Sequence, residues 1–254
     1  MSARMAHPTL SALVPAPDLL APATARLGRP SRTCGEARHY HLAVPTLAEV
    51  AAEAATCTRC RLCESRTNVV FGMGNPDAGL MFIGEGPGAE EDRQGLPFVG
   101  RSGRLLDRLM AEEIGIDRTG CFVANVVRCR PPGNRDPLPD EIDACSPFLE
   151  ATLDIVDPAV VITLGNFATR RLLGTTEGIT RLRGRSYSFR GGHLVPTFHP
   201  SAALRSGGET LAAMRADFVR AKRLLATAGR HLPIEPTNGR SAVVGGGGPG
   251  PLDP

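Results

Sequence analysis

Four short apolar runs alternate with four longer stretches of helical periodicity along the central part of this chain. The runs lie near residues 79–84, 121–127, 159–164 and 193–198 and predict strands. The stretches lie near residues 102–114, 139–156, 166–173 and 209–227 and predict helices. Strands that are each followed by a helix form a parallel sheet with helices on its faces. The alternation therefore predicts a three-layer α/β/α fold.

The chain is long enough for one domain with an extension at each end. It has 254 residues, of which 42% are hydrophobic, enough for one sizeable core. Residues 1–45 are rich in Ala, Pro and Arg, and residues 228–254 are rich in Gly and Pro, which predicts disordered extensions. Thr46 and Glu49 form a capping-box pattern for a helix through Ala55. The folded domain is therefore predicted over residues 46–227.

Five of the seven cysteines lie in two groups. Cys57, Cys60 and Cys63 share one turn-rich segment, and Cys129 and Cys145 flank a Pro-rich loop and a helix. No apolar run is long enough to span a membrane and no signal-peptide pattern is present, which predicts a cytoplasmic protein. Clustered cysteines in such a protein favour a metal or iron–sulfur site over disulfides. Two pairs, Cys57 with Cys60 and Cys129 with Cys145, would supply the four thiolates of a zinc ion or a [4Fe–4S] cluster, and the spacing does not separate these.

The alternative for the cysteines is a set of reduced thiols in the core. Cys121 lies inside the second apolar run and fits that role best, while Cys34 stands apart from both groups.

A glycine-rich loop, Gly84-Glu85-Gly86-Pro87-Gly88, follows the first apolar run. Its spacing matches neither dinucleotide-binding nor P-loop patterns, and Pro87 lacks the amide that a phosphate cradle would use. By itself it predicts a tight turn between strand and helix. The next segment is acidic, and it leads to Phe98 in a loop bounded by Gly and Pro. That aromatic ring suits stacking on a planar base, and the alternative is a small loop core.

Two polar residues follow other predicted strands. Asn125 closes the second, and His199-Pro200-Ser201 follows the fourth. An amide side chain can donate one hydrogen bond and accept another at the same time, which recognition of a pyrimidine edge requires. The alternative for Asn125 is a turn residue. For His199 the alternative is a structural histidine. Because the carboxyl ends of parallel strands meet at one edge of a sheet, the two residues are expected to share a site with the glycine-rich loop.

From about Leu47 to Leu225 the chain resembles family 4 uracil-DNA glycosylases, the iron–sulfur class of the uracil-DNA glycosylase superfamily. The matching stretches are Cys57-Thr58-Arg59-Cys60, residues 66–72, Gly84 to Asp92, Pro97-Phe98-Val99-Gly100, residues 125–132 and His199-Pro200-Ser201. Their order and spacing together are highly specific.

The resemblance implies a central four-stranded parallel sheet and an enzyme that flips uracil out of DNA and hydrolyses its N-glycosidic bond, leaving an abasic site. It also implies a [4Fe–4S] cluster on Cys57, Cys60, Cys129 and Cys145, with Cys63 as a bystander. The partner would be uracil-containing DNA, single- or double-stranded. We expect a monomer in the bacterial cytoplasm, associated with the nucleoid.

The resemblance assigns roles to particular residues. Phe98 would stack on the extruded base, Asn125 would pair with its N3–H and O4 edge, and His199 would hydrogen-bond the charge that develops at O2. Glu85 would orient water or stabilise the sugar cation, and Glu91 would lie against C5 and exclude the methyl group of thymine. Which carboxylate activates water stays open. Gly84 and Gly86 complete the substrate-binding set, and Ser201, Leu204 and Arg205 the DNA-binding set, with Leu204 as a wedge on a loop that probes the minor groove.

Two other functions stay open. One is a superfamily member that binds uracil in DNA, or bonds covalently to the DNA, with little turnover. Such members carry an extra basic loop after the segment that contains Phe98, whereas here residues 97–103 run directly into the predicted helix. The other is an iron–sulfur redox or sensor protein, although the cysteines lie in segments that also place Asn125.

Overall fold

The computed structural model of the protein describes residues 45–229. The two predicted extensions and Cys34 lie outside the described residues, apart from a few residues at the inner ends of the extensions, and the domain limits 46 and 227 remain predictions. The predicted capping box is confirmed at the start of α1 (Leu47–Ala55). Thr46 Oγ1 accepts a hydrogen bond from the Glu49 amide at 3.2 Å, and the Glu49 carboxylate accepts one from the Thr46 amide at 2.7 Å.

A six-stranded sheet with the order β1-β3-β2-β4-β6-β5 forms the centre of the fold. Its strands are β1 (Met73–Gly74), β2 (Leu80–Gly84), β3 (Phe122–Asn125), β4 (Val160–Leu164), β5 (Tyr187–Phe189) and β6 (Gly192–Thr197). The four central strands pair in parallel, which confirms the predicted four-stranded core. The short edge strands β1 and β5 pair antiparallel, and the sequence did not predict them because two or three residues carry no readable alternation.

The four long helical stretches are confirmed, and the short helices were not predicted. The long elements are α3 (Arg101–Leu109), continued by a π-helical turn, η2 (Met110–Ile114), then α4 (Pro139–Val156), α5 (Asn166–Leu173) and α8 (Gly208–Thr227). The short ones are η1 (Arg61–Glu64), α2 (Ala89–Gln94), η3 (Arg118–Gly120), η4 (Pro132–Asn134), α6 (Ile179–Leu182) and α7 (Pro200–Ser206). No helix within residues 45–229 has the length and apolar content to cross a membrane.

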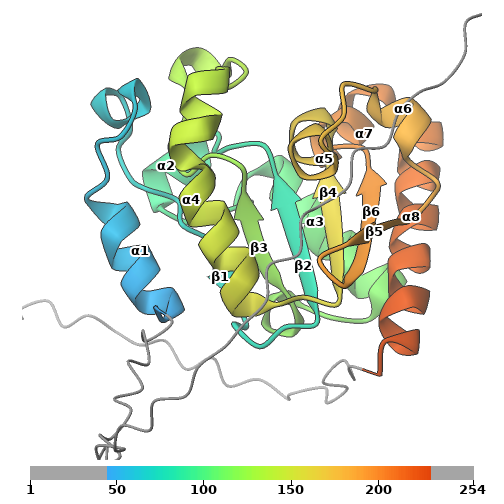
Figure 1. Cartoon of the computed structure of the whole chain (residues 1–254). Coiled ribbons are helices and arrows are strands. Elements are labelled where there is room, and N and C mark those ends of the chain that lie inside the picture. Colours follow the sequence, from blue (N-terminus) through green and yellow to red (C-terminus); the bar gives the residue numbers. More distant parts are fainter. Residues whose placement is uncertain (1–44, 230–254) are drawn as a thin grey trace, which may run out of the picture. The chain divides into compact units, whose positions relative to one another are not determined.

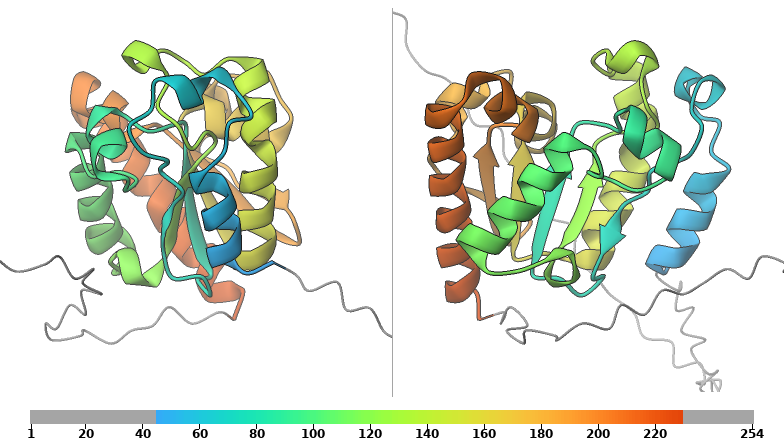
Figure 2. Two further views of the ribbon diagram at one scale, coloured as in Figure 1. Left: turned by 90° about the vertical axis from the view of Figure 1, so that its left-hand side faces the viewer. Right: turned by 180° about the vertical axis from the view of Figure 1, so that it is seen from behind.

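Helices cover both faces of the sheet, as the sequence predicted. Helices α1, α4 and α5 pack on one face, and α3 and α8 on the other (Figures 1 and 2). Strand β2 shows how the two cores separate, because Leu80 and Phe82 join one core and Met81 and Ile83 the other. The carboxyl ends of the parallel strands lie together at the top of Figure 1. The fold thus has one edge at which loops from several strands meet.

We predict that Thr46→Ala lowers the free energy of unfolding by about 1 kcal/mol, because the α1 amides lose their side-chain cap. Urea unfolding of the purified protein measures this difference. The control is Thr180→Ala at an exposed position of α6, which is expected to change the free energy by less than about 0.5 kcal/mol. Equal effects of the two substitutions would contradict a stabilising contribution of the Thr46 cap.

Candidate active site and cysteine cavity

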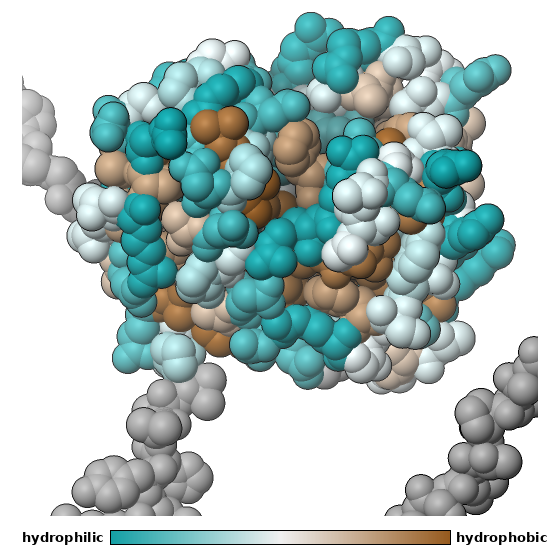
Figure 3. Space-filling model, turned by 45° about the horizontal axis from the view of Figure 1, so that its top comes forward, coloured by the Kyte–Doolittle hydropathy of each residue, from teal (hydrophilic) through white to brown (hydrophobic). Residues whose placement is uncertain are grey.

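The carboxyl edge of the sheet carries a pocket of about 1690 Å³, including its open mouth. Gly84 and Asn125 are register partners at the ends of β2 and β3, and His199 lies two residues beyond β6. All the predicted catalytic and substrate-binding residues line this pocket except Gly84, which lies beneath Phe98 and Asn125. Figure 3 turns the top of Figure 1 forward and shows apolar side chains between hydrophilic ones on this face. The structure thus brings the predicted site together.

Gly84 permits the closest approach within the site. A Cβ atom there would lie 2.5 Å from Asn125 Oδ1 and 2.5 Å from Phe98 Cζ, so any other residue would displace one of these two side chains. Gly86 is similar, because a Cβ atom would lie 2.8 Å from a methyl group of Val127. The glycines therefore serve close packing of the recognition residues.

Phe98 has an unusual backbone that other residues hold in place. Its φ of 54° lies in the left-handed region, which a bulky residue adopts only when its surroundings impose it. Glu91 Oε1 accepts hydrogen bonds from the amides of Val99 and Gly100, each at 3.0 Å. Arg118 donates to the carbonyl of Pro97 at 2.8 Å and to the carbonyl of Phe98. The ring is thereby fixed, 6% exposed, beneath the pocket.

Arg118 and Glu91 both hold the loop of Phe98 through its backbone. Arg118, which also pairs with Asp107 at 2.7 Å, was missed, because nothing in its sequence neighbourhood indicates that it reaches the loop of Phe98. Glu91 lines the pocket as predicted, but one of its oxygens is engaged by backbone amides. Glu91 therefore holds the loop of Phe98 through the amides of Val99 and Gly100. Its place against the base stays a prediction.

Asn125 presents an unpaired acceptor. Its side chain is 1% exposed, and Oδ1 has no hydrogen-bond partner among residues 45–229. A buried polar atom without a partner costs free energy, so such an atom commonly marks a place where a ligand binds. The predicted turn role is thereby disfavoured, because a turn residue satisfies its own backbone.

His199 is held as a neutral donor. It is the N-cap of α7, and its Nδ1 accepts from the Ser201 amide at 3.2 Å and lies 2.8 Å from Ser201 Oγ. Burial lowers its pKa to about 4, with Arg205 adding to the decrease and Glu91 opposing it. The neutral ring then carries its proton on Nε2. Its ring centroid lies 5.9 Å from that of Phe98.

Glu85 has the opposite perturbation. Burial, with a smaller contribution from Asp136, raises its pKa to about 7. Two groups of one pocket thus have pKa values moved in opposite directions, His199 downward and Glu85 upward, and both moves favour the neutral form. Such pairs are typical of sites that perform acid–base or electrostatic catalysis.

The loop predicted for Leu204 and Arg205 is wrong, because both residues lie in α7. Pro200 at the first helical turn and His199 at the N-cap start a helix there, and it ends at Gly207 with φ of 78°. Leu204 remains 42% exposed, and Arg205 lines the pocket. Ser201, also predicted to contact DNA, is engaged with His199.

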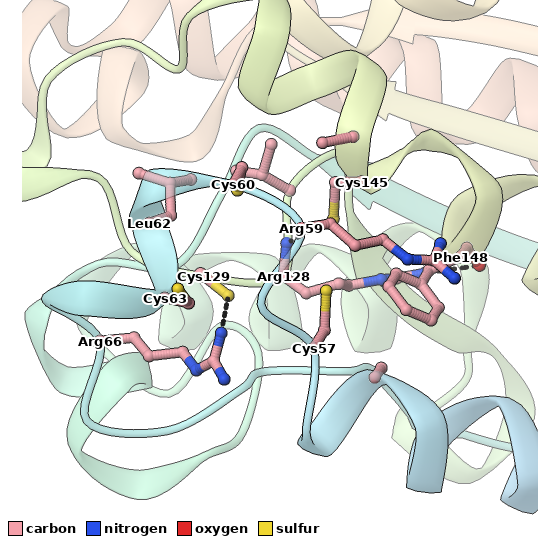
Figure 4. Close-up of a pocket in the computed structure, with 13 residues that line it drawn as sticks. Cys57, Arg59, Cys60, Leu62, Cys63, Arg66, Arg128, Cys129, Cys145 and Phe148 are labelled. Atoms are coloured by element: carbon pink, nitrogen blue, oxygen red, sulfur yellow. Dashed lines mark hydrogen bonds between the residues drawn. The ribbon is translucent and has the colours of Figure 1, made fainter.

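Five cysteines line a second cavity of about 350 Å³, including its open mouth, and it shares no lining residue with the pocket. They are Cys57, Cys60, Cys63, Cys129 and Cys145. In Figure 4 the sulfur atoms of the four predicted ligands surround a common space, and Cys63 lies to one side, next to Cys129. Arg66 donates to Cys129 Sγ at 3.4 Å, and the Arg128 amide donates to Cys145 Sγ at 3.3 Å.

The thiols of this cavity are buried or partly buried, and they interact electrostatically with one another. Burial raises the pKa of Cys129 to about 11 and also raises the pKa values of Cys60 and Cys145, and neighbouring thiols add to each increase. No group of three or more His, Cys, Asp or Glu side chains in residues 45–229 is arranged to hold a single metal ion. Thiols spread around a cavity instead suit a cluster, in which each thiolate binds a different iron.

One further cysteine lies in the core, and one buried arginine lies at the cavity. Cys121 is fully buried, and burial raises its pKa to about 12, so its predicted core role is confirmed. Arg128 also lines the cavity and was missed, because a single Arg in an Arg-rich chain carries no signal. Burial lowers its pKa to about 10, which leaves it charged at neutral pH.

Comparisons with known proteins agree with this geometry. The family model described as Uracil DNA glycosylase superfamily matches residues 71–223. The Type-4 uracil-DNA glycosylase of Thermotoga maritima is 48% identical over 157 residues, covering 61% of this chain and 81% of the relative. That of Sulfurisphaera tokodaii is 43% identical over 167 residues, covering 63% and 76%. That of Saccharolobus solfataricus is 44% identical over 163 residues, covering 61% and 76%.

We predict that Glu85→Gln stabilises the protein at pH 8 and not at pH 4.5. Folding raises the pKa of this carboxyl group from 4.5 to about 7. The free energy of unfolding therefore falls as the pH rises through that interval, and because glutamine does not ionise, the variant avoids this loss. With allowance for solvent screening, the gain at pH 8 is of order 1 kcal/mol. Urea unfolding at both pH values measures it, with exposed Glu64→Gln as control. A gain that does not depend on pH would contradict the raised pKa.

Proposed function

The chain belongs to the uracil-DNA glycosylase superfamily and to its type-4 family, and on that basis we propose that it excises uracil from DNA by hydrolysing the N-glycosidic bond. The observation that carries the proposal is the buried, unpaired Oδ1 of Asn125 next to the Phe98 ring. Uracil offers a donor at N3–H and an acceptor at O4, which one amide group satisfies together. The substrate is uracil in DNA, and its removal initiates repair of deaminated cytosine.

The same atoms give a reason to reject cytosine. Cytosine presents an acceptor at N3 and a donor at its amino group, the reverse of uracil. With the amide oriented as in the structure, Asn125 Oδ1 would stay buried and unpaired if cytosine entered, and the ring N3 would face it as a second acceptor. A site built to hydrogen-bond one pattern rejects the opposite pattern strongly, because buried polar groups lose their partners. The predicted exclusion of thymine by Glu91 is part of the proposal.

Bond cleavage leaves negative charge on the departing uracil and positive charge on the sugar. The Nε2–H of neutral His199 is proposed to donate to O2 of uracil as that charge develops. Glu85, when ionised, is proposed to orient the attacking water or to stabilise the sugar cation. Phe98 stacks on the base and, with its clamped loop, restricts the base to one orientation.

A flipped base requires the DNA to be opened and held. Extrusion costs a few kcal/mol, and less for a mismatched or single-stranded uracil. Leu204 is proposed to wedge into the vacated stack from α7, and Arg205 at the pocket mouth to contact a phosphate. Because a helix presents Leu204, the wedge is more rigid than the predicted loop would make it.

The cysteine cavity is proposed to hold a [4Fe–4S] cluster on Cys57, Cys60, Cys129 and Cys145. Its support is the donor set: four thiols around one apolar cavity, two of them buried and two partly buried, with Arg66 and the Arg128 amide already donating to two of the sulfur atoms. The cluster would supply cross-linking of three chain segments. Since Cys129 follows Asn125 by four residues, a structural role explains its position better than the redox alternative.

The alternative of uracil binding without turnover has less support. Helix α3 begins at Arg101, directly after the loop of Phe98, so no extra loop covers the pocket there. We propose a monomer that turns over uracil in single- or double-stranded DNA.

We predict that His199→Ala and Asn125→Ala each reduce the rate of uracil excision by about 100- to 1000-fold, because each removes a hydrogen bond that forms or strengthens in the transition state. The assay incubates the protein with oligonucleotides that contain one uracil, single-stranded or opposite G or A, and cleaves the product with alkali. His193→Ala, at the start of β6, is the matched control and is expected to keep the activity. Binding or an alkali-stable adduct without excision by the wild type would favour the non-turnover alternative.

We predict that kcat/KM for excision rises with pH and levels off above about pH 7. Glu85 acts when ionised, its pKa is raised to about 7, and His199 with a pKa of about 4 is already neutral throughout this range. Initial rates at low substrate between pH 5.5 and 9 give the profile. In Glu85→Gln the rate should be low and the inflection absent. An inflection unchanged in that variant would assign it to another group.

A further inference from the structure

Arg128 is a buried cation next to the cysteine cavity. It is the largest of the fully buried side chains in residues 45–229, with 1% of its surface exposed. It precedes Cys129 in the chain, its backbone amide donates to Cys145 Sγ at 3.3 Å, and it is one of the residues that line the cavity. Figure 4 shows it among the cysteines with Arg59 and Arg66.

The guanidinium group of Arg128 has too few partners for its charge. Nη2 donates to Thr152 Oγ1 at 2.9 Å and to the Phe148 carbonyl at 3.4 Å, and the group lies 5.0 Å from the ring centre of Phe71. Nε and Nη1 have no partner, and no carboxylate in residues 45–229 forms an ion pair with Arg128. All its contacts are therefore with neutral groups or with an aromatic face.

The other buried charges among residues 45–229 have partners that Arg128 lacks. Asp92 accepts hydrogen bonds from the amides of Thr67 and Asn68 at 2.9 and 3.3 Å. Glu141 and Asp217, both 0% exposed, form ion pairs with Arg135 at 2.6 Å and with Arg183 at 2.9 Å. An arginine stays protonated in a protein interior, and an uncompensated buried charge is strongly destabilising. A negative charge is thus missing near Arg128. The ionisable side chain that interacts electrostatically with its guanidinium group is Cys145, one of the four proposed cluster ligands.

We propose that Arg128 is the buried counter-charge of the anionic iron–sulfur cluster, acting through the thiolate of Cys145. The inference rests on the cofactor assignment of the proposed function. Four thiolates around an iron–sulfur cube give a net negative charge, and net charge and hydrogen bonds to the sulfur atoms set the properties of such clusters. Arg128 is therefore a positioning residue that stabilises the loaded protein and destabilises the empty one. A packing role alone would stabilise both forms.

The test compares four proteins: the wild type, Arg128→Met, Arg128→Lys and Arg59→Met. Methionine keeps an unbranched apolar chain without the charge, and lysine keeps the charge. Arg59 lines the same cavity, but its side chain is 44% exposed and pairs with Glu53 at 2.6 Å, so Arg59→Met is the matched control. Iron content and the decay of visible absorbance in chelator report cluster retention, and thermal unfolding is measured with the cluster and after its removal.

We expect Arg128→Met to lose the cluster about 10- to 100-fold faster than the wild type, the range found when groups behind metal ligands are removed. Arg128→Lys should approach the wild type, and Arg59→Met should stay within about twofold of it, as for an exposed ion pair. Without the cluster, Arg128→Met should unfold at a higher temperature than the wild type, because the unpaired cation is gone.

Equal retention by Arg128→Met and the wild type would overturn the inference, as would loss in Arg128→Lys as fast as in Arg128→Met. So would a lower unfolding temperature of Arg128→Met in the empty form. If the wild type itself carries no iron when isolated anaerobically, both the cluster assignment and the counter-charge fail. Uracil excision by that same sample would then show that the proposed reaction stands without them.

Discussion

The parallel register of β2 and β3 fixes where base recognition can occur. It places Gly84 opposite Asn125 at the carboxyl edge, and only the missing side chain of Gly84 leaves room for the Asn125 amide and the Phe98 ring together. The same register continues past the strands, since the amides of Val126 and Val127 donate to the carbonyls of Gly84 and Glu85 at 2.9 and 3.1 Å. The glycine-rich loop and the loop after β3 are therefore tied to each other by backbone hydrogen bonds, and such ties favour one orientation of a bound base.

Burial then sets the chemistry of the residues that this edge collects. Removal from water disfavours charge, so it lowers the pKa of His199 and raises that of Glu85. A neutral histidine can donate a proton in a hydrogen bond without bringing a full charge into the pocket. A carboxyl group that ionises near neutral pH can act on water or on a developing cation. The two roles need no contact between the residues, only a shared pocket closed on one side by the sheet.

The cysteine cavity connects to this site through the chain itself. Asn125 ends β3, and four residues later Cys129 lines the cavity, between α1 and α4. The Val70 amide donates to the Arg128 carbonyl at 2.8 Å, which ties a second segment to the same stretch. A cofactor bound there would hold the recognition strand against the helical layer. It would also neutralise Arg128, whose burial is otherwise difficult to explain.

The sequence by itself determined the strand and helix alternation, the start of α1 and the identity of the polar residues at the strand ends. These are local properties: apolar periodicity, a capping box and residues placed directly after apolar runs. It did not reveal the edge strands β1 and β5 or helix α7, because their patterns are too short, and it placed Leu204 on a loop. Only the tertiary structure decided that Arg118 clamps the loop of Phe98, that Ser201 orients His199 and that Arg128 is buried without a counter-charge. Those facts depend on contacts between segments far apart in the chain and on exclusion of water, which no local pattern encodes.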